Sequence, residues 1–293
     1  MRPLSGVATT IGIMTFACAL IAGTTLLAKA LGTGWGGPAL SPFQITAGRY
    51  FFALLTLIGA FAALRPRLSA PNVKLHGLRA FCGWAGVTAM FAATALIPLA
   101  DAVAITFLNP IFTMLFAIPF LGEHVGPRRW GAALFCFVGA LLLIRPGMSS
   151  FQPLGLIALF AAFILGFEAM LVKFLSQREG MFQILLMSNL FGTGFSAVSL
   201  GFVWVSPTLV QWLAMAAIGV LMVSAQALFI AALRRGDVSF VSPLFYATLV
   251  FAAFYDFLLF GVIPTGLSLF GIAIILVGAI LLGVSEHRRA KGL

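Results

Sequence analysis

Charged residues are what this sequence has least of. Only 8% of its 293 residues are charged, and Asp and Glu together number 7, whereas soluble domains typically carry about 25% charged residues. So few charges cannot cover the surface of a water-soluble protein of this size. The mean hydropathy of +1.13 indicates the same. The composition predicts an all-α polytopic membrane protein whose first partner is the lipid bilayer.

Other scarcities exclude whole classes of function. The three histidines, His76, His124 and His287, lie at span ends or in loops, so no His-rich metal cluster or paired haem ligands are expected. All three cysteines fall inside apolar stretches and are interpreted as packing residues. The sequence contains no G-x-x-x-x-G-K-[ST] loop for ATP. We predict no cofactor, no bound metal and no nucleic-acid partner.

Long apolar runs divide the chain into about ten segments that are long enough to cross a bilayer. Pro110, Pro119 and Pro243 predict kinks in the fourth and ninth segments. The first segment resembles a signal peptide near Ala28-Lys29-Ala30, but its apolar run is longer than a signal h-region, and we interpret it as a retained span. The expected spans are approximately 7–31, 42–64, 75–96, 101–121, 128–145, 154–176, 181–205, 208–233, 238–260 and 266–285.

The basic residues predict the orientation of the spans. With both termini in the cytoplasm, 14 basic residues lie on the inner side and only Arg145 lies in an outer loop. This bias matches the positive-inside rule for a multi-pass protein of the cell inner membrane. The inner set is Arg2, Arg65, Arg67, Lys74, Arg79, Arg128, Arg129, Lys173, Arg178, Arg234, Arg235, Arg288, Arg289 and Lys291.

Two regions of the chain resemble each other at a nearly fixed offset. Gly122 aligns with Gly261, and residues 139–143 align with 278–282, both at an offset of 139 positions in the sequence. Residues 19–29 also resemble 163–173; chance similarity between Gly/Ala/Leu helices is the alternative. A true repeat divides the chain into five-helix halves, 1–147 and 148–293, and an odd number of spans inverts one half relative to the other. Inverted repeats are typical of secondary transporters, which bind substrate between the halves near the midplane.

Several short motifs recur at defined places within these halves. They are Ala22 to Lys29, Arg49, Asn109-Pro110, Leu121-Gly122-Glu123, Trp130-Gly131, Gly139 and Ala231 to Asp237. In their order and spacing, these motifs resemble the EamA-type branch of the drug/metabolite transporter superfamily. The family usually has Gly-Glu after the ninth span as well, whereas here Val262 follows Gly261. The resemblance implies ten spans in two halves and export of small metabolites, often amino acids, from the bacterial cytoplasm.

Glu168 is the most informative charge, since it lies about 12 Å inside the sixth span at 1.5 Å per residue. A charge at the bilayer centre costs about 2.5–3.5 kcal/mol on insertion scales, so such residues face the bundle interior. One interpretation is a ligand for a substrate ammonium or a proton acceptor. The other is a structural ion pair or a protonated acid. Lys173, five residues on, is poorly spaced to pair with Glu168 on the same helix.

Four further residues are predicted to contact substrate: Trp84 by stacking, and Asn109, Gln226 and Tyr246 by hydrogen bonds. For each, packing or an interhelical hydrogen bond is the alternative. Lys29, Arg49 and Asp256 fall in the outer half of the bundle under the predicted topology. We predict that Asp256 pairs with one of these two bases and helps to close the outer mouth. The alternative is three separate side chains that extend toward the membrane surface.

These observations favour a secondary exporter that acts by alternating access, with amino acids of broad specificity as cargo and a monomer as the working state. Apolar walls with few fixed charges suit amino acids, and coupling to protons through Glu168 or Asp256 is one option beside facilitated diffusion. The alternatives are export of a nucleobase, vitamin or organic cation, a passive channel, and an intramembrane enzyme. Tyr255-Asp256 and Gly236-Asp237 resemble the paired aspartates of intramembrane proteases but occur in the wrong order.

Overall fold

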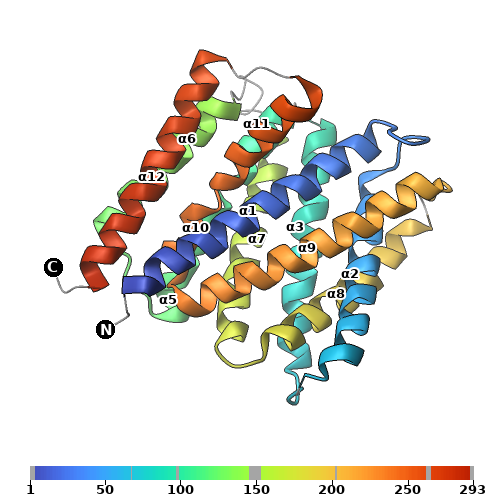
Figure 1. The fold of residues 1–293 in the computed structure, drawn as a ribbon, viewed down its shortest axis with the longest axis horizontal. Helices are drawn as coiled ribbons and strands as arrows, with labels where there is room; N and C mark the ends of the chain where they lie inside the picture. Colours follow the sequence, from blue (N-terminus) through green and yellow to red (C-terminus); the bar gives the residue numbers. More distant parts are fainter. Residues whose placement is uncertain are drawn as a thin grey trace.

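The computed structural model describes residues 4–66, 68–96, 99–144, 153–201, 203–261 and 265–290, and within them it contains helices and no strand. The helices form one bundle, and the first turn of α1 and the last turn of α12 lie at the same end of it (Figure 1). Their bounds are α1 Leu4–Gly32, α2 Pro42–Leu64, α3 Val73–Leu96, α4 Leu99–Thr106, α5 Asn109–Leu121, α6 Pro127–Ile144, α7 Gly155–Ser176, α8 Met181–Leu200, α9 Leu209–Arg235, α10 Val238–Leu244, α11 Ala247–Phe260 and α12 Gly266–Ala290.

The predicted spans agree with these helices, if the pairs α4–α5 and α10–α11 are each counted as one span. Among the described residues, nine helical segments are long and apolar enough to cross a membrane. α3 is not one of the nine, since Lys74, His76 and Arg79 in its first two turns lower its hydropathy. The expected fold class is confirmed: an all-α membrane protein with the architecture of two inverted five-helix repeats.

The fourth and ninth spans are interrupted, as their prolines predict. Pro110 lies just after the first break, and Pro243 lies just before the second. At each break the helix tightens into bonds of the i to i−3 type, from Leu108 N–H to the Ile105 carbonyl and from Tyr246 N–H to the Pro243 carbonyl. Pro119 lies inside α5, which continues through it to Leu121, so this proline does not end its helix and the kink there stays a prediction.

The two breaks contact each other across the bundle. The hydroxyl of Tyr246 donates a hydrogen bond of 2.8 Å to the carbonyl oxygen of Phe107, and these residues are 139 positions apart. Tyr246 is fully buried. A carbonyl freed by a helix break has no water to bond to in lipid, so a partner inside the protein has to replace the lost bond. A side chain of the second repeat therefore contributes to the stability of the break in the first.

Further pairs at the same offset of 139 occupy equivalent positions. Gly122 and Gly261 both have φ of +65° directly after a helix, a backbone conformation that glycine adopts without strain. Gln44 bonds to the backbone of Val205, and Gln183 accepts from the N–H of Ser69, so each glutamine joins the start of one helix to a loop of the other repeat. These equivalences match the internal repeat seen in the sequence.

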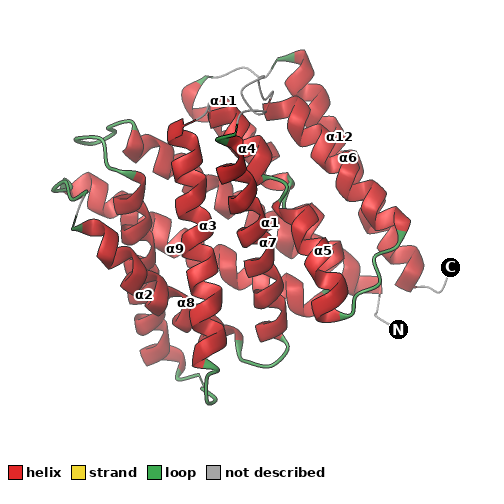
Figure 2. Cartoon of the chain, turned by 180° about the vertical axis from the view of Figure 1, so that it is seen from behind, coloured by secondary structure: helices red, strands yellow, loops and turns green. Residues whose placement is uncertain are grey.

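The repeats interleave along their whole length. α1 packs mainly against α9 and α11, whereas α3 packs against α7 and α8. α2 packs between α8 and α9, α5 packs on α7, and α6 packs on α12 at one edge of the bundle (Figures 1 and 2). The principal neighbours of most helices thus belong to the other repeat, and the space between repeats runs through the centre of the molecule.

Tyr246→Phe removes only the hydroxyl that bonds to the Phe107 carbonyl. We expect it to lower the free energy of unfolding by about 0.5–2 kcal/mol, because the carbonyl is left without its partner in a buried site. Equilibrium unfolding in mixed detergent micelles measures this loss. Tyr255→Phe, which removes a longer bond of 3.3 Å to the Ala19 carbonyl, is the matched control and should cost less. Equal effects of the two variants would contradict the assignment.

A second prediction concerns the close approach of α9 to α2. A Cβ added at Gly219 would lie 2.6 Å from the Cβ of Phe52 and 2.8 Å from the backbone nitrogen of Ala53, so the helices would have to separate. At Gly194 in α8, no heavy atom of the described residues lies within 4 Å of an added Cβ. We therefore expect Gly219→Ala to lower the melting temperature by several degrees and Gly194→Ala to leave it unchanged or raise it. A melting temperature of Gly219→Ala equal to that of the unmodified protein would contradict the close packing.

Candidate functional site: a central cavity between the repeats

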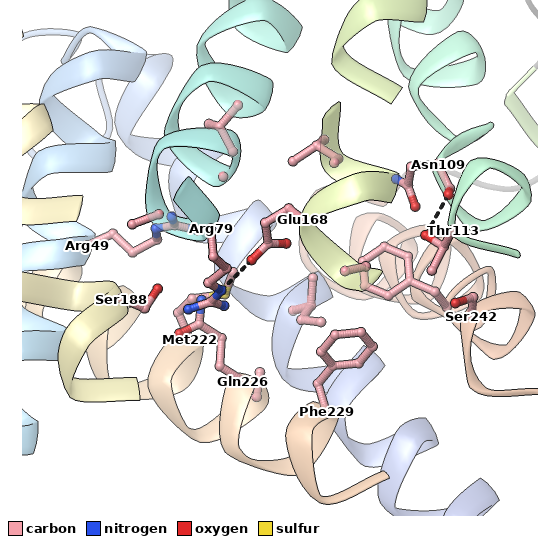
Figure 3. Close-up of a pocket in the computed structure, with 18 of the residues that line it drawn as sticks. Arg49, Arg79, Asn109, Thr113, Glu168, Ser188, Met222, Gln226, Phe229 and Ser242 are labelled. Atoms are coloured by element: carbon pink, nitrogen blue, oxygen red, sulfur yellow. Dashed lines mark hydrogen bonds and ion pairs between the residues drawn. The ribbon is translucent and has the colours of Figure 1, made fainter. Parts of the chain in front are cut away.

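A cavity of about 240 Å³ lies in the middle of the bundle, where α2, α3 and α5 of the first repeat face α7, α8, α9 and α10 of the second. α1 also contributes one residue to its wall. Apolar side chains make up most of the lining, with a smaller set of polar and charged groups among them (Figure 3). The lining residues are Ile21, Arg49, Tyr50, Arg79, Ala80, Gly83, Val87, Asn109, Thr113, Leu165, Glu168, Ala169, Ser188, Met222, Ala225, Gln226, Phe229, Ser242 and Phe245.

An ion pair between the repeats lies at the centre of this cavity. Nε of Arg79 on α3 lies 2.8 Å from Oε1 of Glu168 on α7, and the two side chains are 5% and 19% exposed. Gly83, one turn further along α3, lies beside the pair, and an added Cβ there would meet Cγ of Glu168 at an ordinary contact distance of 3.7 Å. Removing either charge would leave the other buried without a partner, which is strongly destabilising.

The polar groups divide into two sets on either side of Glu168. In Figure 3, Arg49 and Arg79 lie on one side, and Asn109, Thr113 and Ser242 lie on the other. The guanidinium of Arg49 lies 4.3 Å from the ring centre of its neighbour Tyr50. The Thr113 hydroxyl donates to the Asn109 carbonyl at 2.8 Å. A ligand in this cavity would therefore meet positive charge at one end and uncharged polar groups at the other.

The structure brings together four of the predicted site residues. Asn109, Glu168, Gln226 and Arg49 all line the cavity. Trp84 and Tyr246 are not among the described lining residues. Trp84 packs beside the rings of Phe81 and Phe195, with ring centres 6.2 and 6.1 Å away, and the Tyr246 hydroxyl is bonded to Phe107 as described above.

The predicted outer cluster is only partly visible. Lys29 is exposed near the end of α1, and Arg49 faces the cavity from α2. The side chain of Asp256 lies outside the described residues, so its pairing with either base stays a prediction.

Arg79 is the charged residue of the cavity that the sequence analysis did not recognise. It was counted among the basic residues of the inner side, but α3 begins at Val73, so Arg79 lies well within the helix and is 4% exposed. The signal that could have found it is the spacing of Arg79 and Gly83, which places a base and a small residue one turn apart on the same helix face.

A second group of polar contacts joins the repeats at the end of the bundle where the termini lie. The Glu123 carboxylate accepts from the N–H of Val238 at 2.6 Å and from the N–H of Ser239 at 3.0 Å. Arg129 donates to the Ser239 hydroxyl at 2.6 Å and lies 2.9 Å from Asp237. The carboxylate thus occupies the positive end of α10.

Lys173 and the loop after α7 extend these contacts. The ammonium of Lys173 donates to the carbonyls of Leu233 and Gly236 at the end of α9, so its partners come from another helix, as its poor spacing from Glu168 predicts. Glu179 lies 2.7 Å from Nε2 of His76. Burial raises the pKa of Glu179, but hydrogen bonds from His76 and Asn72 outweigh that effect and hold the pKa below its ordinary value of 4.5. The Glu179 carboxylate therefore stays negatively charged in this contact until the pH falls through its lowered pKa.

The fold and the cavity define a membrane transporter built from two inverted repeats. The sequence pattern of the EamA-like transporter family matches residues 9–145 and 153–284, one match in each repeat, and the chain belongs to this family. The prediction from the motifs is confirmed at this level.

Several curated proteins are similar to the chain. An S-adenosylmethionine uptake transporter of Rickettsia bellii is 26% identical over 95% of each chain. A riboflavin transporter of Vibrio cholerae is 27% identical over 83% of each. A pseudopaline exporter of Pseudomonas aeruginosa is 28% identical over 73% of this chain and 76% of its own. A solved crystal structure, 24% identical, has the same fold, with a TM-score of 0.80 over 94% of this chain and 98% of the other.

Replacing Glu123 tests whether the contacts with α10 hold that end of the bundle closed. Glu123→Gln removes the charge and leaves one oxygen to serve two backbone N–H groups, so α10 should separate more often from α5 and α6. The reporter is a cysteine placed at Ala169 in the cavity wall, in a protein whose Cys18, Cys82 and Cys136 are replaced by alanine. We expect an impermeant thiol reagent, applied from the side of the termini, to label this cysteine several-fold faster in Glu123→Gln.

The matched control for this experiment is His124→Gln at the neighbouring exposed position, which should leave the labelling rate unchanged. An unchanged rate in Glu123→Gln would show that these contacts do not limit access to the cavity.

Proposed function

We propose that this protein is a secondary transporter that exports small amphipathic metabolites, with amino acids of broad specificity as its substrates, by alternating access between its two repeats. The observation that carries the proposal is the cavity itself, which lies between the repeats, has mainly apolar walls and contains one carboxylate, paired with Arg79, and a second guanidinium, that of Arg49. An α-amino acid carries one charge of each sign and a variable side chain, which matches this arrangement.

Each group in the cavity has a role in this proposal. Glu168 binds the substrate ammonium through its carboxylate. The amides of Asn109 and Gln226 bond to the polar atoms of the bound molecule, and the apolar wall around Phe229 and Phe245 accommodates side chains of different shape. Few specific contacts to the side chain explain broad specificity, because apolar pockets discriminate weakly between substrates that differ by a methylene.

In the proposed export cycle, the termini and the Glu123 contacts lie on the cytoplasmic side, where substrate enters the cavity. The contacts at that end join helices of different repeats. These contacts would break when the cavity opens to the cytoplasm. Proton coupling through Glu168 and facilitated diffusion are both compatible with this cycle, and a pH gradient distinguishes them.

A second candidate is uptake of S-adenosylmethionine. The relative whose name states this activity is similar over 95% of each chain. S-adenosylmethionine also carries an amino-acid head group, so the same charged residues would bind it. Its sulfonium adds a positive charge, which the two arginines disfavour.

Counterflow in proteoliposomes tests the proposal. Vesicles are loaded with one unlabelled amino acid from a panel, and entry of a labelled amino acid is followed with and without a pH gradient. We expect saturable exchange with several amino acids, and we expect Glu168→Gln to raise the half-saturating concentration at least tenfold, because it removes the partner of the ammonium. Glu286→Gln, the same change in the last part of α12, is the matched control.

A folded preparation that exchanges no amino acid would exclude amino acids as cargo. Exchange of S-adenosylmethionine alone in that preparation would favour the second candidate.

A further inference from the structure

Three polar atoms in the cavity wall have no hydrogen-bond partner within the described part of the chain. They are Nη1 of Arg79, Oε1 of Gln226 and Oγ of Ser242, from α3, α9 and α10. Arg79 and Ser242 are each only 4% exposed. Buried polar groups in folded proteins are nearly always bonded. These atoms have almost no exposed surface, so a ligand in the cavity would bond to them as the neighbouring side chains adjust to it.

Arg79 keeps one N–H-bearing atom that Glu168 does not bind. Glu168 holds the Nε atom of Arg79 at 2.8 Å, which leaves Nη1 available on the same planar group. Arg49 adds a second guanidinium to the lining, so the charged residues of the described lining are two bases and one acid. The cavity therefore has a net positive charge in surroundings where charge is weakly screened. This favours a ligand with a negative group and disfavours a simple organic cation.

A guanidinium fits one kind of anion particularly well. Its N–H groups lie in a fixed plane that matches the two oxygens of a carboxylate, and such bonds are roughly twice as strong as those between neutral groups. A donor close to that carboxylate can reach the unpartnered oxygen of Gln226. At the other side of Glu168, Ser242 lies in the wall that would contact the rest of the molecule (Figure 3), and Phe229 and Phe245 also line the cavity.

We propose that Arg79 selects the substrate by binding its carboxylate, so that the cavity accepts small organic carboxylates and rejects amines that lack a carboxylate. Glu168 has a second role here as a positioning residue, since it fixes the plane of the guanidinium. This inference rests on the proposed function and narrows it, because it assigns selectivity to the carboxylate end of the substrate and not to the ammonium.

Four compounds that share a phenyl group distinguish binding through the carboxylate from binding through the ammonium. L-phenylalanine carries both, 3-phenylpropionate only the carboxylate, and L-phenylalaninamide and phenethylamine only the amine. The measurement is competition by each compound against counterflow of labelled L-phenylalanine. We expect both carboxylates to compete at least tenfold better than both amines. Amines that compete as well as the carboxylates would overturn the proposal.

Substitutions of Arg79 then assign this preference to one side chain. In Arg79→Gln, carboxylates should compete no more than about threefold better than amines. Arg79→Lys keeps the charge but loses the planar pair of donors, and it should retain part of the preference. Arg128→Gln removes the same charge from an exposed position on α6 and should keep the full preference. An Arg79→Gln protein that still prefers carboxylates tenfold would overturn the assignment. If Arg79→Gln does not fold, Arg79→Lys and the ligand series on the unmodified protein decide.

A second measurement separates failure of this inference from failure of the proposed function. If the folded protein exchanges no amino acid, the proposed function is excluded, and the ligand preference is then read from thermal unfolding of the purified protein in detergent. Stabilisation by 3-phenylpropionate but not by phenethylamine at equal concentration would support selection of a carboxylate. Equal stabilisation by the two, or none by either, would overturn it.

Discussion

The rest of the structure depends on one constraint, which is that no backbone carbonyl can be left without a partner inside the membrane. Among the described residues, the chain departs from regular helix at two points within its spans, after Thr106 and after Leu244. At the first point, the carbonyl of Phe107 accepts a hydrogen bond from the hydroxyl of Tyr246, and Tyr246 lies at the second point. Because each irregular segment lies against the other repeat, the helix breaks occur at the centre of the molecule, where a cavity can form without exposing polar backbone to lipid.

The same constraint applies to charged side chains. Arg79 and Glu168 pair across the repeats in the middle of the bundle, and Arg129 and Asp237 pair across them at the end near the termini. Buried pairs of this kind add little stability compared with apolar packing, but breaking one is costly. Their position therefore says more about function than about folding: the central pair lies where a ligand can bind to it, and the pair at the end lies where helices of the two repeats would separate.

Much of the fold could be predicted from the sequence because the bilayer sets the length of each span and the prolines mark the breaks. The equivalence of Gly122 and Gly261 was also visible, because the same turn requires the same residue in both repeats. The direction of side chains could not be predicted in the same way. A helix in lipid is apolar on its outer face as well as its inner face, so periodicity does not show which residues face the cavity. Tyr246 and Trp84 were assigned to the cavity for this reason, and Arg79 was missed because its charge also fits the loop bias of the inner side.

The interleaving of the repeats has a consequence for biosynthesis. α1 ends at Gly32 and its main neighbour α9 begins at Leu209, so about 175 residues are synthesised between them. At about 5–20 residues per second, α1 waits roughly 10–35 s in the membrane before that neighbour leaves the ribosome. During this interval the nascent first repeat presents the surfaces of α1 and α2 that α9 later covers, to lipid or to membrane chaperones. A ribosome that stops between the repeats therefore leaves a product in which the first repeat lacks its main helix contacts.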